Sequence, residues 1–198
     1  FVYHGPGTYQ EIAPTAGYAS TSASGVSGDG SIVAGIVSIP QTLSFQAFRW
    51  TSLGGVQLLG MARPGDGYSN ASSISRDGST IAGASGGGSN PAVACVWRQG
   101  SGVSILPSLP GSTSSGALGV NFDGSIVVGQ SGPSGHAAMW RNGQVTDLGV
   151  PQGFLGSTIS VGVNDLGTVV VGYTSSSTTR VSTISPLRTP RERAWPTP

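Results

Sequence analysis

Short runs of alternating apolar and polar residues, separated by glycine-containing turns, recur along the chain and predict β-strands. In the clearest instance, residues 71–75 and 79–83 flank the pair Asp77-Gly78. An Asp-Gly pair between two β-prone runs is the strongest short-range signal of a β-hairpin, because glycine tolerates the positive φ that the turn demands. The pattern therefore predicts hairpins.

The hairpin motif, which we call the phrase, occurs three times with an Asp-Gly pair. A fourth copy, at residues 162–172, has Leu166-Gly167 in place of that pair. The first three copies contain the turn residues Asp29, Gly30, Asp77, Gly78, Asp123 and Gly124, and the fourth copy has Gly167. The register glycines stand at steps of 48, 46 and 43 residues. A repeat of roughly 40–50 residues is typical of β-propeller blades.

Two further runs complete each repeat. The first ends in an aromatic residue, at Trp50, Trp97 and Trp140, and the second follows after a glycine-containing turn. Four short strands joined by tight turns form an up-and-down meander, which is the blade of a propeller. Burying a large apolar side chain contributes roughly 1.5–3 kcal/mol. We therefore expect the three tryptophans to pack between neighbouring blades.

The predicted fold is an all-β propeller of four-stranded antiparallel blades, with a parallel β-solenoid as the alternative. Whole blades begin near Ala16, Pro64 and Ser112. Residues 1–13 match the second half of a blade, and residues 157–175 match the first half. The two halves add up to a fourth, split blade. They pair within one chain or between molecules, unless the chain is a fragment whose missing blades lie elsewhere.

The domain prediction is a repeat domain over residues 1–175 and a tail over residues 176–198. The tail holds four prolines and four of the nine arginines. No Asp-Gly signal or strand alternation is evident from residue 180 onward. We expect either an extended tail or an arm that docks on a neighbour through Trp195 and the cluster of arginines.

Composition narrows the functional classes. Charged residues make up 9% of the chain, lysine is absent, and no basic stripe with interleaved aromatics marks a nucleic-acid surface. No apolar run approaches the roughly 20 residues that span a bilayer. A surface rich in small hydroxyl residues is common in secreted and cell-surface β proteins. The chain begins at Phe1 without a signal segment, so we expect a mature secreted form or a fragment.

The residue types that bind metals or catalyse reactions in other proteins are better explained in this sequence by structural roles. A calcium loop needs several clustered oxygen ligands, whereas each repeat offers one turn aspartate. Ser85 lies in the letters of a nucleophile elbow but at the end of a hairpin strand. His4, His136 and Cys95 are too few and too scattered for a zinc site. The sequence predicts no catalytic residue, no metal and no cofactor.

The alternation of the Asp-Gly-Ser phrase with a His/Gln-Ala-Phe-x-Trp phrase and a Leu-Gly phrase resembles the HAF-repeat family of bacterial extracellular proteins. The clearest matches are residues 46–50 and 136–140, with Leu-Gly pairs at 59–60 and 148–149. The resemblance covers residues 1–175 and implies a propeller-like fold with secretion or surface display. The chain departs from it after Tyr173, where the His-Ala-Phe phrase is missing.

Three functional hypotheses follow. The leading one is a non-enzymatic, secreted or surface-displayed structural or adhesive protein that forms a homo-oligomer or polymer through its incomplete terminal blades, with assembly residues Phe1, Tyr3, Tyr9 and Trp195. The alternative is a glycan-binding module that uses the loop aromatics Tyr18, Tyr68 and Phe154. An enzyme ranks third, because the acids outside the turns, Glu11, Asp66 and Asp147, show no spacing that pairs two carboxylates.

Overall fold

The computed structural model describes residues 1–186 except 15, 43, 133–134, 152–155 and 176–179. Its strands form five separate antiparallel sheets, three of which have four strands in chain order. Blade 1 contains β3 (Ser20–Val26), β4 (Ile32–Ser38), β5 (Phe45–Thr51) and β6 (Gly55–Leu58). Blade 2 contains β7 (Tyr68–Ile74), β8 (Thr80–Gly87), β9 (Asn90–Arg98) and β10 (Gly102–Ile105). Blade 3 contains β11 (Ser115–Val120), β12 (Ile126–Ser131), β13 (His136–Arg141) and β14 (Gln144–Gly149).

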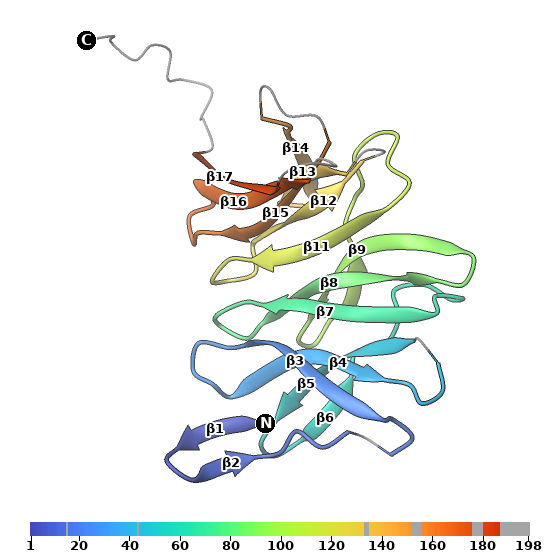
Figure 1. The fold of residues 1–198 in the computed structure, drawn as a ribbon, viewed down its shortest axis with the longest axis vertical. Coiled ribbons are helices and arrows are strands. Elements are labelled where there is room, and N and C mark those ends of the chain that lie inside the picture. Colours follow the sequence, from blue (N-terminus) through green and yellow to red (C-terminus); the bar gives the residue numbers. More distant parts are fainter. Residues whose placement is uncertain (15, 43, 133–134, 152–155, 176–179, 187–198) are drawn as a thin grey trace.

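Two incomplete sheets lie at opposite ends of the stack of blades (Figure 1). The N-terminal hairpin consists of β1 (Val2–Gly5) and β2 (Thr8–Gln10), and the C-terminal sheet of β15 (Ser157–Val163), β16 (Val169–Ser175) and β17 (Arg180–Pro186). The predicted all-β fold of four-stranded antiparallel blades is confirmed, and the parallel solenoid is not what the strands form. The two incomplete sheets remain separate and do not join into one split blade.

Strand β17 corrects the expectation that the chain has no strand beyond residue 175. Residues 180–186 pair with β16 along its whole length, from Ser175↔Arg180 to Val169↔Pro186. The segment lacks an Asp-Gly turn and an aromatic residue, and for this reason the repeat pattern missed it. Residues 180–186 form a strand because the edge of β16 offers unpaired backbone groups with which they make hydrogen bonds.

Each Asp-Gly turn is held by local hydrogen bonds. Asp29 accepts from the Ser27 hydroxyl at 2.6 Å and from the backbone N–H of Ser31 at 3.0 Å, while Gly30 adopts φ 74°. Asp77 and Asp123 accept the equivalent bond from the backbone N–H two residues on, at 2.9 and 3.0 Å. These bonds close the turn and leave the aspartates as turn formers.

The glycine that ends each phrase is required by a close approach of two strands. A Cβ on Gly35 would lie 2.1 Å from the carbonyl oxygen of Ser22, and one on Gly83 would lie 1.9 Å from that of Asn70. The equivalent distances at Gly129 and Gly172 are 2.0 and 2.1 Å. No larger residue fits there, and this explains why the phrase ends in glycine in every repeat.

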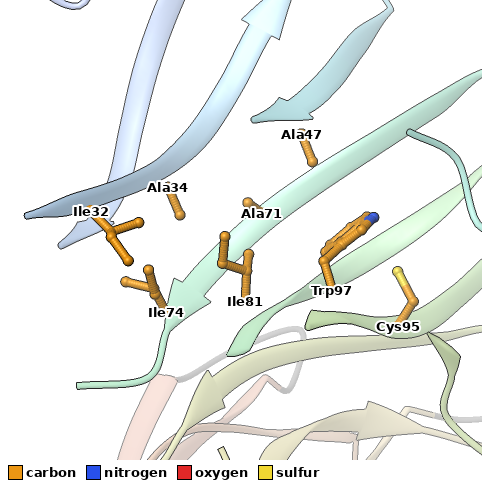
Figure 2. Close-up of a cluster of buried hydrophobic side chains, with 8 residues drawn as sticks. All are labelled: Ile32, Ala34, Ala47, Ala71, Ile74, Ile81, Cys95 and Trp97. Carbon is orange, nitrogen blue, oxygen red and sulfur yellow. The ribbon is translucent and has the colours of Figure 1, made fainter. Parts of the chain in front are cut away.

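Neighbouring blades pack through one tryptophan each. Trp97 is 3% exposed and lies in a cluster with Ile81 and Cys95 of its own blade and with Ile32 and Ala34 of blade 1 (Figure 2). Trp140 is 2% exposed and occupies the same place between blades 2 and 3. The core of the molecule is therefore a series of inter-blade layers, not one central cluster.

A hydroxyl on the first strand of blade 2, of blade 3 and of the C-terminal sheet joins that strand to the third strand of the preceding blade. Ser69 accepts from the backbone N–H of Ala47 at 3.0 Å, and Ser115 from that of Ala94 at 2.9 Å. Thr158 accepts from the N–H of Ala137 at 2.8 Å. Ser69 is fully buried. The repeated hydroxyl thus satisfies a backbone donor at these three junctions.

Candidate functional site

The N-terminal hairpin takes the place of the third and fourth strands of a blade that would precede blade 1. Tyr3 pairs with Tyr9 across the hairpin, just as Trp50 pairs with Val56 and Trp97 with Val103. The side chains of Val2 and Ile12 pack against the blade 1 cluster that contains Trp50. The hairpin is therefore a half-blade that packs on blade 1, and among the strands that the structure describes β1 pairs only with β2.

A cavity of about 660 Å³ lies between this half-blade and blade 1. Residues of β1, of β3 and of the first Asp-Gly turn line it, together with Val33 and Trp50. At the next junction the corresponding space is filled by β4 of blade 1, because Ile74 and Ile81 pack on Ile32 and Ala34. The cavity thus occupies the place that the first two strands of a preceding blade would fill.

The two junctions also differ in how far equivalent residues of the repeat are exposed to solvent. Val26 of β3 is 56% exposed, whereas Ile74, which stands at the same repeat position in β7, is 8% exposed. Val26 is therefore an apolar side chain that the neighbouring elements do not cover, whereas its counterpart in blade 2 is covered. We call the cavity wall made of Val26, Val33, Trp50 and the edge of β1 opposite β2 the open face; Val26 is its exposed side chain, and Val33 and Trp50 are each 4% exposed.

The predicted assembly residues Phe1, Tyr3 and Tyr9 come together at the N-terminal hairpin, and Phe1 and Tyr3 also line the cavity. The ring of Tyr9 contacts that of Phe1 at 5.4 Å and that of Tyr3 at 5.3 Å between centroids. The three are 79%, 55% and 64% exposed. Aromatic pairs with this geometry are favourable, and a cluster so exposed extends the apolar surface at this end of the molecule. Trp195 lies outside the described residues.

At the other end, β17 occupies the edge of β16 on which the third strand of a blade would lie. Ser185 stands opposite Val170, at the position where Trp50, Trp97 and Trp140 stand opposite their own second strands. The C-terminal sheet also exposes Val161 (42%) and Val171 (37%). Among the described residues this sheet has three strands, and its third strand lacks the aromatic residue of the repeat.

Two of the three aromatics predicted to lie in loops and bind a ligand contact adjacent residues at the start of β5, and Tyr68 is the first residue of β7 instead of a loop residue. The Tyr18 hydroxyl donates to Gln46 Oε1 at 2.8 Å, while the Tyr68 ring contacts that of Phe45 at 5.0 Å. Neighbouring residues of a strand point to opposite faces, so the two tyrosines do not form one platform. Phe154 lies outside the described residues.

Ser85 is fully buried and serves a polar cluster, a role that the sequence did not indicate. Its hydroxyl donates to Asp66 at 2.6 Å, and Asn90 and Arg63 donate to the other carboxylate oxygen at 2.8 and 3.2 Å. The Asp66 side chain has no exposed surface. Burial raises the pKa of Asp66, but the hydrogen bonds from Ser85, Asn90 and Arg63 and the Arg63 charge lower it more, so the pKa lies below 3.8.

The remaining titratable candidates do not converge. His136 Nδ1 lies 2.9 Å from Asp147 Oδ2 at the surface of blade 3, far along the chain from His4 on β1. Burial raises the pKa of the Cys95 thiol to about 12, which suits a core residue. Hydrogen bonds from Ser27 and Ser31 lower the pKa of Asp29 to about 2. Within the described ranges, no three His, Cys, Asp or Glu side chains are placed to hold a metal ion.

Comparisons with known proteins bear on the fold alone. No protein-family model matches the chain, and no curated protein sequence does either. Two similar solved structures are TolB from Acinetobacter baumannii, with TM-score 0.58 and 14% identity, and a putative TolB from Agrobacterium tumefaciens, with 0.57 and 14%. A prolyl endopeptidase structure aligns with TM-score 0.53 and 11% identity.

These alignments cover 84%, 82% and 86% of this chain but 41%, 56% and 28% of the other chains. The chain therefore spans less than two thirds of the length of each. Together they support the assignment of the β-propeller fold. In the part of the chain that the structure describes, no helix has the length and apolar character that a membrane crossing requires.

Proposed function

We propose that the chain is a non-enzymatic, secreted or surface-displayed structural protein that assembles head to tail through its incomplete terminal blades and serves an adhesive role. The observation that carries this proposal is the open face, with its cavity of about 660 Å³ and its exposed Val26. The resemblance to HAF-repeat proteins supports the extracellular setting.

In the proposed contact, β15 and β16 of one copy supply the first two strands of a blade, and β1 and β2 of the next copy supply the third and fourth. The open face of the second copy is then covered as β4 covers blade 2 within the chain. Tyr3 takes the place of the tryptophan, because its cross-strand pairing with Tyr9 matches that of Trp50 with Val56. Such strand addition satisfies the free edge of β1.

This contact requires β17 to leave the edge of β16. Register supports the exchange, since β17 places Ser185 at the aromatic position and β1 offers Tyr3 there. An aromatic side chain buried between blades contributes more apolar area than a serine does. We therefore propose that β17 caps the C-terminal sheet in the single chain and is displaced when a second copy docks.

Light scattering coupled to size-exclusion chromatography tests the assembly. We expect the wild-type chain to form particles of more than one copy, with a mass that grows with concentration, and Val26→Lys to be monomeric because the charge would be buried in the contact. The matched control is Leu53→Lys, at a fully exposed turn position away from the open face. A wild-type chain that stays monomeric at all concentrations contradicts the proposal.

Locking β17 in place tests the exchange separately. Val171 and Ile184 stand opposite each other in the register of β16 and β17. In a chain with Val171→Cys and Ile184→Cys, we expect the oxidised form to be monomeric and the reduced form to assemble. Assembly of the oxidised form to the wild-type extent would show that β17 stays in place, leaving self-assembly itself intact.

A glycan-binding module is the second proposal, and the observation that favours it is the partly exposed ring pair of Phe45 and Tyr68. Aromatic faces of this kind stack on sugar rings. We expect Tyr68→Ala to abolish binding on a glycan array and Tyr18→Phe, on the opposite side of β5, to leave it unchanged. An array without any bound glycan contradicts this proposal.

A further inference from the structure

The junction between blades 1 and 2 contains a second cavity, of about 360 Å³. Arg49, Gln57 and Leu59 of blade 1 line one side, and Ile81, Trp97 and Arg98 of blade 2 line the other. Arg49 stands next to Trp50 in β5, at the position where the later blades have Val96 and Met139. Of the three equivalent positions, only the one in blade 1 is charged.

Two buried donors at this junction lack an acceptor. Arg49 Nε and Trp97 Nε1 are inaccessible to solvent and have no hydrogen-bond partner among the described residues. At the next junction the equivalent indole, that of Trp140, donates to the carbonyl oxygen of Pro107 at 2.6 Å. Buried donors are almost always paired, so two unpaired ones at the same cavity indicate a missing acceptor.

The surrounding charge is positive. No aspartate or glutamate is among the residues that line the cavity. Asp77, which precedes the lining residue Gly78, already accepts hydrogen bonds from Ser75 and Ser79. The ion pairs of the described residues join Arg63 to Asp66 and His136 to Asp147, and neither engages Arg49 or Arg98. A guanidinium without a counter-ion beside a second arginine favours an anionic oxygen ligand.

We infer that this cavity binds the carboxylate of a small ligand, with Arg49 as the principal contact and the indole N–H of Trp97 as a second donor. A carboxylate accepts from both groups and neutralises the arginine, which neutral sugars and water do not. The site lies between blades 1 and 2, so it does not depend on assembly through the open face.

Nuclear magnetic resonance titration of the ¹⁵N-labelled full chain tests the site at constant ionic strength. The probes are sodium glucuronate, sodium acetate and glucose, and the indole resonance of Trp97 is assigned by its loss in Trp97→Phe. We expect a saturable shift of this resonance with glucuronate and acetate and none with glucose. Equal affinities for the two anions would identify the carboxylate as the recognised group, and tighter glucuronate binding would add the sugar ring to it.

Variants separate binding from folding. Arg49→Met, which copies the residue of blade 3, is expected to weaken glucuronate binding more than 10-fold, whereas Arg141→Met at the surface is expected to leave it unchanged. Should Arg49→Met fail to fold, calorimetric titration of Trp97→Phe with glucuronate provides the second readout, with weaker binding expected. An unshifted indole, a shift by chloride alone, or equal binding of glucose would overturn the inference.

Discussion

The N-terminal faces of blades 1 and 2 are built from the same phrase and end in different environments. Ile74 is 8% exposed beneath blade 1, while Val26, at the same position of the repeat, is 56% exposed beside a cavity. The local strands, turns and glycines are alike in both blades. The two blades differ in the element that precedes each of them, which is blade 1 for blade 2 and the two-stranded hairpin for blade 1. The repeat motif therefore specifies the strands of a blade, while the burial of its side chains depends on the element packed against it.

Replacing the tryptophans of blades 1 and 2 should give the largest difference in the free energy of unfolding between the two blades. Trp97 packs against side chains of both blades, whereas Trp50 borders the cavity on its outer side. We expect Trp97→Ala to lower the free energy of unfolding by about 3–5 kcal/mol, as is typical of a buried tryptophan. Trp50→Ala should cost less, because Trp50 borders the cavity of about 660 Å³ and Trp97 the smaller one of about 360 Å³, although the two side chains are 4% and 3% exposed. Urea unfolding at low protein concentration measures both, and equal losses would break the comparison.

The pair Ile74 and Val26 gives the next largest effect. Ile74→Ala should lower the free energy of unfolding by about 2–4 kcal/mol, since it leaves a cavity between packed blades. Val26→Ala should change that of the single chain by less than about 0.5 kcal/mol, as exposed positions do. A large loss from Val26→Ala at dilutions where only single chains are present would show that the open face is already covered within one chain.

Acid unfolding tests a polar cluster of blade 2, in which Asp66 of the loop before β7 accepts from Ser85 of β8 and Asn90 of β9. The pKa of Asp66 is lower in the folded chain than the ordinary 3.8, so protonation favours the unfolded state. Its stabilisation is present above about pH 5 and is lost as the pH falls through 3.8 towards the folded-state value.

At neutral pH, Asp66→Asn should cost about 1–3 kcal/mol, because a buried charged acceptor is lost. Its stability should then fall less between pH 7 and pH 3 than that of the wild-type chain. The remaining fall belongs to the turn aspartates, since Ser27 and Ser31 lower the pKa of Asp29 to about 2. Parallel pH curves for the two chains would contradict the role assigned to Asp66. Guanidinium unfolding across the pH range is the measurement.

Much of the fold was predictable because each repeat contains local sequence signals for its own strands and turns. The Asp-Gly turns, the third strands ending in tryptophan and the half-blade at residues 1–13 all follow from local pattern, and the structure places strands at each of them. The strand of residues 180–186 was not predictable, because it has neither the turn nor the aromatic residue. It forms by pairing with β16, an edge effect that sequence pattern does not show.

The candidate sites were predictable to a smaller extent. The aromatic residues Phe1, Tyr3 and Tyr9 were identified from the half-blade and do cluster. Tyr18 and Tyr68 were identified as loop aromatics, but the alternation of side chains along β5 separates them. The role of Asp66 depends on contacts with β8 and β9, and the unpaired donor of Arg49 depends on packing between blades; no local pattern reveals either.

The central claim is that β1 of one copy pairs with β16 of another, and a cysteine cross-link tests it most directly. In a completed blade Tyr3 would stand opposite Val170, as Trp50 stands opposite Val33. A chain with Tyr3→Cys and Val170→Cys should give a ladder of disulfide-linked multimers on oxidation, and one with Tyr9→Cys and Val170→Cys should not. A product that contains only monomers, or equal ladders from both variants, would contradict the account.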